Sequence, residues 1–379
     1  MATQQDKPIQ IAGAGPAGLS AAITLARAGT QVIVHEAQAK VGWRFKHDFQ
    51  GLENWTTQRD VLQVLADDGI TTDFDVLPGK KGMAYDGWGQ GYPIQTKTPF
   101  FYLVVRGPGP GSLDHALLQQ AQELGVDVRF KSRVKKLPFP SILATGPKAV
   151  DAIAVGYLFD TGMEDGFWVI CDNTLAPGGY AYLLVWNGKG TVKTCMFSGF
   201  KQEKLHVEKT VAAFKRLVGL EMKNPIHHGG VGNFYVPLRA YAGKRPVVGE
   251  QAGFQDALWG FGIRHAVTSG ILAARSLLEE ADYAALWTAE FKEQLKVSIV
   301  NRALYNKLGN RGYRFFLKRI SGKQDLRKSL YGQYHPGFVK TLLYPWASRS
   351  VKKLRSDTDC RHTDCECVWC RSCDDHSVS

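Results

Sequence analysis

The sequence predicts an α/β protein in which a core with a parallel sheet carries an inserted antiparallel sheet and a helical C-terminal extension. Three observations predict this class. A short apolar run near the N-terminus leads into a glycine-rich turn and an alanine- and leucine-rich stretch. Residues 66–105 and 150–240 alternate short apolar runs with Gly, Asp and Asn turns, which is typical of antiparallel strands. Beyond residue 285 the chain becomes basic and aromatic, and we expect helices there.

The bulk composition is that of a globular protein, with 44% of the residues hydrophobic and 22% charged. With 379 residues the chain exceeds the size at which one hydrophobic core keeps growing, so we expect two domains, consecutive or interleaved. No apolar run is long enough to span a bilayer, and the first ten residues lack the basic and apolar regions of a secretory signal. These features predict a cytoplasmic protein.

The N-terminal segment has the order strand, glycine-rich turn, helix, strand. Residues 8–12 form a short apolar run suited to a buried parallel strand. The turn 13–18 has the spacing GxGxxG, and residues 19–28 read as a helix closed by Gly29. Residues 31–35 read as a second strand. This order predicts a Rossmann-like dinucleotide-binding unit.

Each part of that unit has a physical task in this sequence. Gly13 permits the tight turn, Gly15 lets the backbone approach a pyrophosphate, and Gly18 lets the helix pack on the strand. Glu36, 23 residues after Gly13, is placed to accept hydrogen bonds from the ribose hydroxyls. The helix N-terminus holds the phosphates, so Pro16 and Ala17 complete the predicted cradle.

The N-terminal unit resembles the signature of flavoproteins related to p-hydroxybenzoate hydroxylase and the geranylgeranyl reductases. Residues 104–106 with 112–118 resemble the family's arginine followed by a leucine, an aspartate and a helix. Residues 141–147 resemble the strand that ends in Ala-Thr-Gly beside the cofactor. Residues 246–274 are similar to the returning strand, glycine-rich turn and long helix that close over the flavin.

The resemblance implies an FAD site at named positions. Glu250 stands where the family has an aspartate near the pyrophosphate and ribityl groups. Gly260 and Gly262 let the backbone pass close to the isoalloxazine ring, and the helix from Ile263 points its N-terminal dipole at that ring. The other implied cofactor residues are Arg44, Arg106, Gly146 and Gly249. Arg106 supports the cofactor or forms a surface ion pair.

Within the superfamily, residues 176–182 resemble the proline–tyrosine–aromatic motif that lines the lipid cavity of geranylgeranyl reductases. Two departures concern the reaction. Thr145 precedes Gly146 where hydroxylases carry aspartate, which weakens the monooxygenase interpretation. Residues 41–45 replace the cysteine-containing glycine motif of many geranylgeranyl reductases.

The middle of the chain predicts a β-hairpin of residues 180–186 and 191–197, joined by 187–190. We expect the substrate between this antiparallel sheet and the flavin, with an acid supplying the proton if a carbon–carbon double bond is reduced. The candidates for catalysis or orientation are His265, Tyr180, Tyr182 and Cys171. The alternative is that the tyrosines and the cysteine are core residues and that His265 is a satisfied polar residue.

Positive charge is concentrated near the C-terminus. The net charge is +12, and residues 292–355 hold sixteen Lys and Arg against two acidic residues. Aromatic residues are interleaved with these bases from 303 to 346. Such a segment suits an anionic membrane surface or, less favoured here, RNA. The alternative is a solvated helical cap without a specific partner.

The last twenty residues contain a cluster of thiols. The spacing C-x4-C-x-C-x2-C-x2-C predicts ligands for zinc or an iron–sulfur cluster, or else reactive thiols in a disordered tail. The cluster consists of Cys360, Cys365, Cys367, Cys370 and Cys373, with His362 and His376 nearby.

These interpretations divide the chain into four parts. We expect an FAD-binding domain from residues 1–66, 104–150 and 245–285, and a β-rich substrate domain from 67–103 and 151–244. The basic helical extension takes 286–355, and the cysteine tail takes 356–379. The leading function is an FAD-dependent reductase or dehydrogenase of an apolar, isoprenoid-like substrate, with NAD(P)H as a candidate electron donor. The alternatives are an FAD-dependent monooxygenase and a flavin-bearing protein that binds or modifies RNA.

Overall fold

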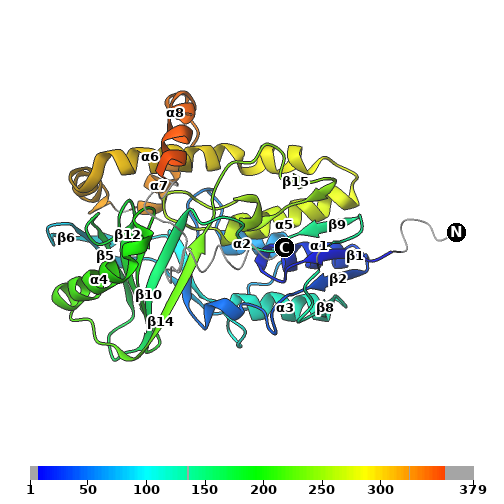
Figure 1. Cartoon of the computed structure of the whole chain (residues 1–379), viewed down its shortest axis with the longest axis horizontal. Helices are drawn as coiled ribbons and strands as arrows, with labels where there is room; N and C mark the ends of the chain where they lie inside the picture. Colours follow the sequence, from blue (N-terminus) through cyan, green and yellow to red (C-terminus); the bar gives the residue numbers. More distant parts are fainter. Residues whose placement is uncertain (1–6, 135, 324, 355–379) are drawn as a thin grey trace.

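A four-stranded parallel sheet forms the N-terminal core of the computed structural model, which describes residues 7–134, 136–323 and 325–354 (Figure 1). Its strand order is β8-β2-β1-β9, so the first two strands lie side by side as predicted. The helix α1 begins at Pro16, three residues earlier than predicted, because proline fits the first helical position. These elements are β1 (Ile9–Ala12), α1 (Pro16–Arg27), β2 (Val32–His35), β8 (Asp127–Arg129) and β9 (Ser141–Leu143).

Two helices that are distant in sequence, α3 (Leu113–Glu123) and α5 (Ile263–Leu278), pack against α1. The approach of α5 is very close: a Cβ atom on Gly270 would lie 2.1 Å from the carbonyl oxygen of Ala17. The segment that follows residue 245 therefore returns to the start of the chain. This confirms the discontinuous Rossmann-like fold that the sequence predicts.

A seven-stranded sheet forms the second layer and is antiparallel except where β11 pairs with β5. The predicted hairpin is confirmed as β12 and β13, although β13 begins two residues earlier than expected. Asn187 and Gly188 form its two-residue turn with φ values of 50° and 72°, as a type I′ turn requires. In spatial order the strands are β14 (Lys223–Gly232), β10 (Ala152–Asp160), β13 (Lys189–Met196), β12 (Tyr180–Trp186), β11 (Gly166–Cys171), β5 (Lys81–Asp86) and β6 (Gly91–Gln95).

The two faces of this sheet have different neighbours. The helix α4 (Glu203–Val218) covers one face, where Leu183 and Val185 pack with Phe214. Because side chains alternate along a strand, Tyr180 and Tyr182 lie on the opposite face. That face packs toward the loop of residues 253–262 before α5, here called the glycine-rich loop, and toward the C-terminal helices.

A small antiparallel sheet of β3 (Phe49–Glu53), β7 (Phe101–Val105) and β4 (Val76–Pro78) lies beside the core. Thus β4 pairs within this small sheet, whereas β5 and β6 from the same predicted segment join the large sheet. The domain boundaries themselves stay a prediction. The remaining short elements are η2 (Trp43–Phe45), α2 (Val61–Asp67), η3 (Phe200–Gln202), β15 (Tyr241–Ala242), β16 (Arg245–Pro246) and η4 (Gly249–Ala252).

The helical extension is confirmed. The long helix α6 (Tyr283–Ile320) is interrupted at Gly309, whose φ of 58° and ψ of −165° are not helical. It is followed by α7 (Leu326–Tyr334) and α8 (Phe338–Leu354), and α8 projects from the body of the molecule (Figure 1). Within the part of the chain that is described, no helix is long and apolar enough to cross a membrane. The cysteine cluster lies outside the described residues.

Candidate functional site

The glycine-rich turn has the geometry of a phosphate cradle. Gly13 has a φ of +103°, and a Cβ atom there would lie 2.2 Å from the carbonyl oxygen of Ala144. A Cβ atom on Gly18 would lie 1.9 Å from the carbonyl oxygen of Gly13. Gly15 differs, because no atom lies within 4 Å of its Cβ position. Gly13 and Gly18 therefore serve the packing of the turn, and Gly15 leaves open space at the N-terminus of α1.

Glu36 braces the turn from the end of β2. Its Oε2 accepts a hydrogen bond of 2.9 Å from the backbone N–H of Ala14, and its Oε1 accepts one of 2.8 Å from Gln38. A carboxylate offers about four acceptor positions, so Glu36 retains capacity for ribose hydroxyls. The predicted glycines and the predicted acid thus lie together.

The returning segment brings Glu250 and Gly249 to the same place. A Cβ atom on Gly249 would lie 2.9 Å from the Cβ of Ala17 in the first turn of α1. The carboxylate of Glu250 forms an ion pair of 3.2 Å with Arg44, whose side chain is half exposed. Three segments that are far apart in sequence therefore converge around the cradle.

The Ala-Thr-Gly strand end joins this group through Thr145. Both its backbone N–H and its hydroxyl donate to Oε1 of Gln251, at 2.8 and 2.9 Å. Gly146 follows with a φ of +85° and open space around its Cβ position. At the position where hydroxylases of the resembled family carry aspartate, Thr145 therefore links the end of β9 to η4 through Gln251.

Arg106 forms a buried ion pair, which corrects the alternative of a surface pair. Its Nε and Nη2 each donate at 2.8 Å to the carboxylate of Asp114, and both side chains are at most 5% exposed. Its guanidinium lies 4.0 Å from the ring centre of Phe45, and that of Arg44 lies 4.7 Å from the same ring. Arg106 therefore supports the loop that carries Arg44.

The loop before α5 contains the other predicted glycines. Gly260 has a φ of +75° with open space around its Cβ position, and Gly262 is the N-cap of α5. Gln255 donates to the carbonyl of Gly260 at 2.8 Å and holds the loop in shape. Ile263, the first residue of the helix, is buried. The first N–H groups of α5 have no partner within the helix, and no side chain caps them.

His265 lies in the packed interface between α5 and α6. Its ring makes an edge contact with Phe291 of α6, with ring centres 5.3 Å apart. Burial lowers the pKa of His265 to about 4, so the ring is neutral at physiological pH. Its Nδ1 has no hydrogen-bond partner among the described residues. A role for His265 in catalysis stays a prediction.

The other catalytic candidates lie on the sheet face opposite α4. Burial raises the pKa of Tyr180 and that of Tyr182 well above 10, and it raises the pKa of Cys171 to about 12. The hydroxyl of Tyr180 donates to the carbonyl of Trp259, and their rings lie 5.3 Å apart. The structure thus brings Tyr180 to the glycine-rich loop. All three groups stay protonated at neutral pH.

Sequence reasoning missed a buried charged group on the same face. Lys193, the cross-strand neighbour of Tyr182, pairs with Asp48, and each of these side chains is 3% exposed. The Nζ of Lys193 lies 3.0 Å from Nδ1 of His228, whose Nε2 lies 2.9 Å from the carbonyl oxygen of Arg44. Burial and the charge of Lys193 lower the pKa of His228. A lysine at an inward-facing position of an apolar strand is the only signal that the sequence offers.

Asp256 in the glycine-rich loop was also missed. Burial raises the pKa of its carboxyl to about 6, although Trp259 and Tyr334 donate hydrogen bonds to it. A carboxyl with a pKa near neutrality is suited to proton transfer. The sequence around Asp256 contains no recognisable acid–base motif. The raised pKa of its carboxyl comes from burial beneath α6 and α7, which the local sequence does not reveal.

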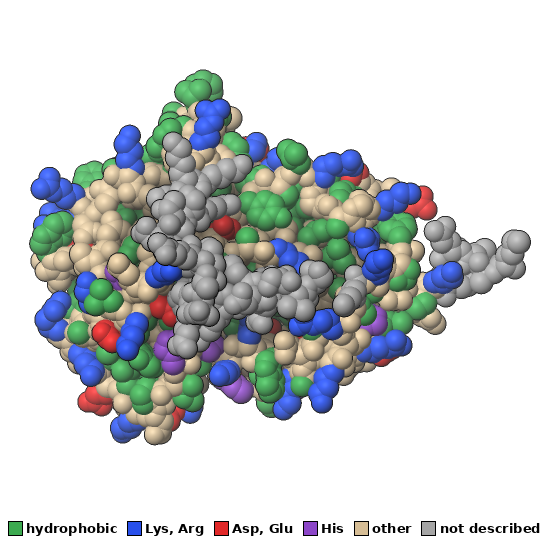
Figure 2. Space-filling view, viewed as in Figure 1, with side chains coloured by type: hydrophobic (Ala, Val, Ile, Leu, Met, Phe, Trp, Pro, Cys, Tyr) green, Lys and Arg blue, Asp and Glu red, His purple; other side chains and the backbone are tan. Residues whose placement is uncertain are grey.

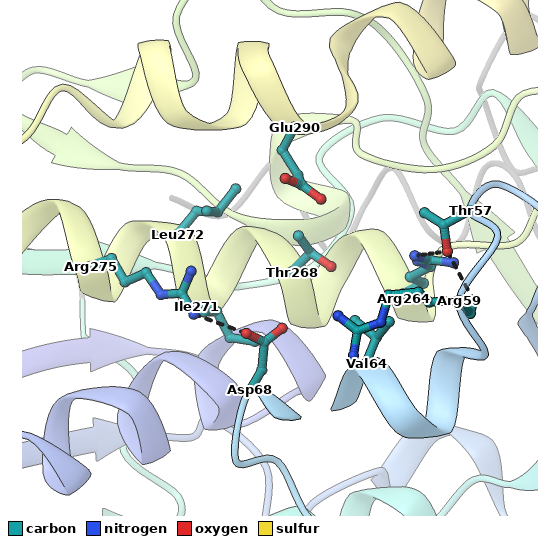
Figure 3. A pocket seen from close by; sticks show the side chains of 10 residues that line it. All are labelled: Thr57, Arg59, Val64, Asp68, Arg264, Thr268, Ile271, Leu272, Arg275 and Glu290. Carbon is teal, nitrogen blue, oxygen red and sulfur yellow. Dashed lines mark hydrogen bonds and ion pairs between the residues drawn. The ribbon is translucent and has the colours of Figure 1, made fainter. Parts of the chain in front are cut away.

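A cavity of about 260 Å³ lies between α2, α5 and α6 (Figure 3). Two of its arginines are already paired: Arg264 with Glu53 at 3.2 Å, and Arg275 with Asp68 at 2.9 Å. None of the predicted catalytic residues lines it. The lining residues are Thr57, Arg59, Val64, Asp68, Arg264, Thr268, Ile271, Leu272, Arg275 and Glu290.

A predicted metal site in the cysteine tail is neither supported nor contradicted. In residues 7–134, 136–323 and 325–354, no group of three or more His, Cys, Asp or Glu could hold a metal ion. The two cysteines described there, Cys171 and Cys195, are both buried and unpaired by disulfide.

Comparisons with known proteins agree with this geometry. Residues 6–138 match the family described as FAD binding domain. None of the curated proteins matches the sequence. Among solved structures, a geranylgeranyl bacteriochlorophyll reductase-like protein from Thermoplasma acidophilum is 16% identical with a TM-score of 0.70, over 92% of this chain and 98% of that chain.

Two solved flavin-dependent proteins share the fold at similar sequence identity. The flavin-dependent brominase Bmp2 is 13% identical with a TM-score of 0.62, over 91% of this chain and 98% of that chain. The pqsL protein of Pseudomonas aeruginosa, described as a probable FAD-dependent monooxygenase, is 14% identical with a TM-score of 0.60, over 82% and 99%. The family match supports an FAD-binding domain in residues 6–138. The solved structures confirm the fold that the resemblance implies. At such identities they do not select the reaction.

Proposed function

We propose, on the premise that residues 6–138 are an FAD-binding domain, that this chain is an FAD-dependent reductase or dehydrogenase of an apolar, isoprenoid-like substrate. The observation that carries the proposal is the aromatic face of the large sheet. Tyr180 and Tyr182 lie on it, and Tyr180 reaches the glycine-rich loop through Trp259. Apolar ligands bind in sites lined mainly by aromatic and aliphatic side chains. The similarity to a geranylgeranyl reductase-like structure supports the same substrate class.

The residues of the cradle fit FAD. Open space at Gly15 and the N-terminus of α1 would hold the pyrophosphate, Glu36 the ribose, and Arg44 with Glu250 the region beyond it. The N-terminus of α5 carries a partial positive charge that stabilises negative charge on a reduced ring. When bound, FAD supplies hydride transfer through N5.

The protein must supply or relay the proton when a carbon–carbon double bond is reduced. Asp256 retains its proton up to about pH 6, since burial raises the pKa of this carboxyl to about 6. It lies close enough to Tyr180 that its charge contributes to the raised pKa of that hydroxyl. We therefore assign proton supply to Asp256 with Tyr334, and we assign orientation of the substrate to Tyr180 and Tyr182.

A purified sample tests the proposal in two steps. A visible spectrum, with release and identification of the chromophore, should give FAD near one per chain. The dithionite-reduced protein, kept without oxygen, should then be reoxidised by geranylgeraniol and yield a product two mass units heavier per reduced bond. Fully saturated phytanol is the matched control and should cause no reoxidation.

Two outcomes would contradict the proposal. If the purified protein is colourless and cannot be reconstituted with FAD, it is not a flavoenzyme. A product that gains one oxygen atom, and forms only when oxygen and NAD(P)H are present, selects the monooxygenase alternative. The assay with oxygen and NAD(P)H is included because this chain shares its fold with pqsL, a probable FAD-dependent monooxygenase.

A further inference from the structure

The projecting end of α8 carries an apolar surface that faces away from the protein. Phe338, Val339 and Leu342 are 84%, 66% and 70% exposed, and Trp346 is 38% exposed. Figure 2 shows hydrophobic side chains at this end of the molecule beside Lys and Arg side chains. We call Phe338, Val339, Leu342 and Trp346 the α8 ridge.

The ridge is one continuous arc of the helix. At about 100° per residue, its four side chains fall within an arc of roughly 100°. The opposite side holds Ala347 and Val351, which are buried against Val300 of α6. The inner face of α8 therefore anchors the helix to the body, and the outer face is apolar without a covering element among the described residues.

The charge around the ridge is positive. Arg349 is exposed on the same arc, and the Nζ of Lys307 lies 5.7 Å from the ring centre of Trp346. Between residues 303 and 351 the sequence contains one acidic residue, Asp325, whose side chain caps the start of α7. A cation beside an exposed tryptophan on an apolar helix face is the composition of interfacial membrane anchors.

We propose that the α8 ridge docks this protein onto the surface of an anionic lipid bilayer. Phe338, Val339 and Leu342 enter the boundary between headgroups and acyl chains, and Trp346 lies at the headgroup level. Lys307 and Arg349 contact the anionic headgroups. A second copy of this chain is a poorer occupant, because a symmetric pair would place these bases against one another.

The test uses the full-length protein with vesicles of phosphatidylcholine, alone or mixed with phosphatidylglycerol. We expect the protein to sediment with the mixed vesicles at low salt, and binding to fall at least tenfold in 0.5 M salt or on phosphatidylcholine alone. The variant Phe338→Ser/Leu342→Ser should bind the mixed vesicles at least tenfold more weakly. Leu238→Ser is the matched control, because Leu238 is 92% exposed outside these helices, and it should bind like the wild type.

The FAD spectrum and circular dichroism of each variant establish that folding is intact, and sedimentation velocity gives the oligomeric state. Three results would overturn the proposal. The first is that the wild type stays in the supernatant with anionic vesicles at low salt. The second is that the double variant binds these vesicles as well as the wild type does. The third is a wild-type dimer that becomes monomeric in the double variant, which would make a second copy the occupant. Each result is independent of the reaction that the flavin site performs.

Discussion

Substitution of Gly15 separates binding of the cofactor from folding of the turn. Gly15 has a φ of −81° and a ψ of 179°, which alanine adopts without strain, and no atom lies within 4 Å of its Cβ position. We therefore expect Gly15→Ala to change the free energy of unfolding by no more than about 0.5 kcal/mol. The added methyl occupies space that the pyrophosphate needs. We expect FAD affinity to fall about a hundredfold, equivalent to about 2.7 kcal/mol.

Gly13→Ala should give the opposite pattern. Its φ of +103° and a Cβ atom 2.2 Å from the carbonyl oxygen of Ala144 would force β1 and β9 apart. We expect a loss of at least about 2 kcal/mol in the unfolding free energy. Gly29→Ala is the control, since its φ is +80° but no atom lies near its Cβ position. It should cost about 1 kcal/mol and leave FAD affinity unchanged.

The assays are urea unfolding of the apoprotein, followed by tryptophan fluorescence, and titration with FAD, followed by quenching of flavin fluorescence. The reasoning is refuted if Gly15→Ala binds FAD within threefold of the wild type. It is also refuted if Gly15→Ala destabilises the apoprotein as strongly as Gly13→Ala, because the open space at Gly15 would then not exist.

Three further substitutions test other parts of the site. Lys193→Met removes the lysine partner of the buried Asp48, so the free energy of unfolding in urea should fall by about 3–5 kcal/mol. Adding Asp48→Asn should restore part of this loss, and no recovery would contradict the pairing. Burial raises the pKa of Asp256 to about 6. Between about pH 4 and 6 the folded state therefore keeps a proton that the unfolded state releases. The free energy of unfolding should fall as the pH rises through this range, by at most about 3 kcal/mol. Asp256→Asn should flatten that slope in urea unfolding at pH 4.5 and 7.5, and an equal slope in both proteins would exclude Asp256 as its source. Tyr182→Phe removes a hydroxyl that has no hydrogen-bond partner among the described residues, so the free energy of unfolding should change by less than about 0.5 kcal/mol. The KM for an active isoprenoid substrate should rise severalfold. An unchanged KM would place the substrate elsewhere.

Local chemistry explains why the sequence predicts the cradle and the hairpin. The turn 13–18 needs glycine where φ is positive or where backbones touch, and these requirements act within a few residues of one another. The turn at Asn187 and Gly188 is determined in the same way. The alternation along β12 likewise predicts which side chains share a face, because the strand has a period of two.

Long-range pairing explains what the sequence does not reveal. Asp48 and Lys193 are 145 positions apart, and only the docking of the loop after β2 onto β13 makes them an ion pair. The raised pKa of Asp256 arises because other elements bury its loop, and no neighbouring residue encodes that burial.

What a side chain on a helix contacts also depends on long-range packing. The sequence by itself places His265 in the first turn of α5, and it predicts a C-terminal helical segment in which aromatic and basic residues alternate. Only the tertiary structure decided that His265 faces Phe291 and that the α8 ridge faces outward. The physical reason is that the partner helix α6 buries one face of each helix, and burial of that face determines what the remaining faces contact.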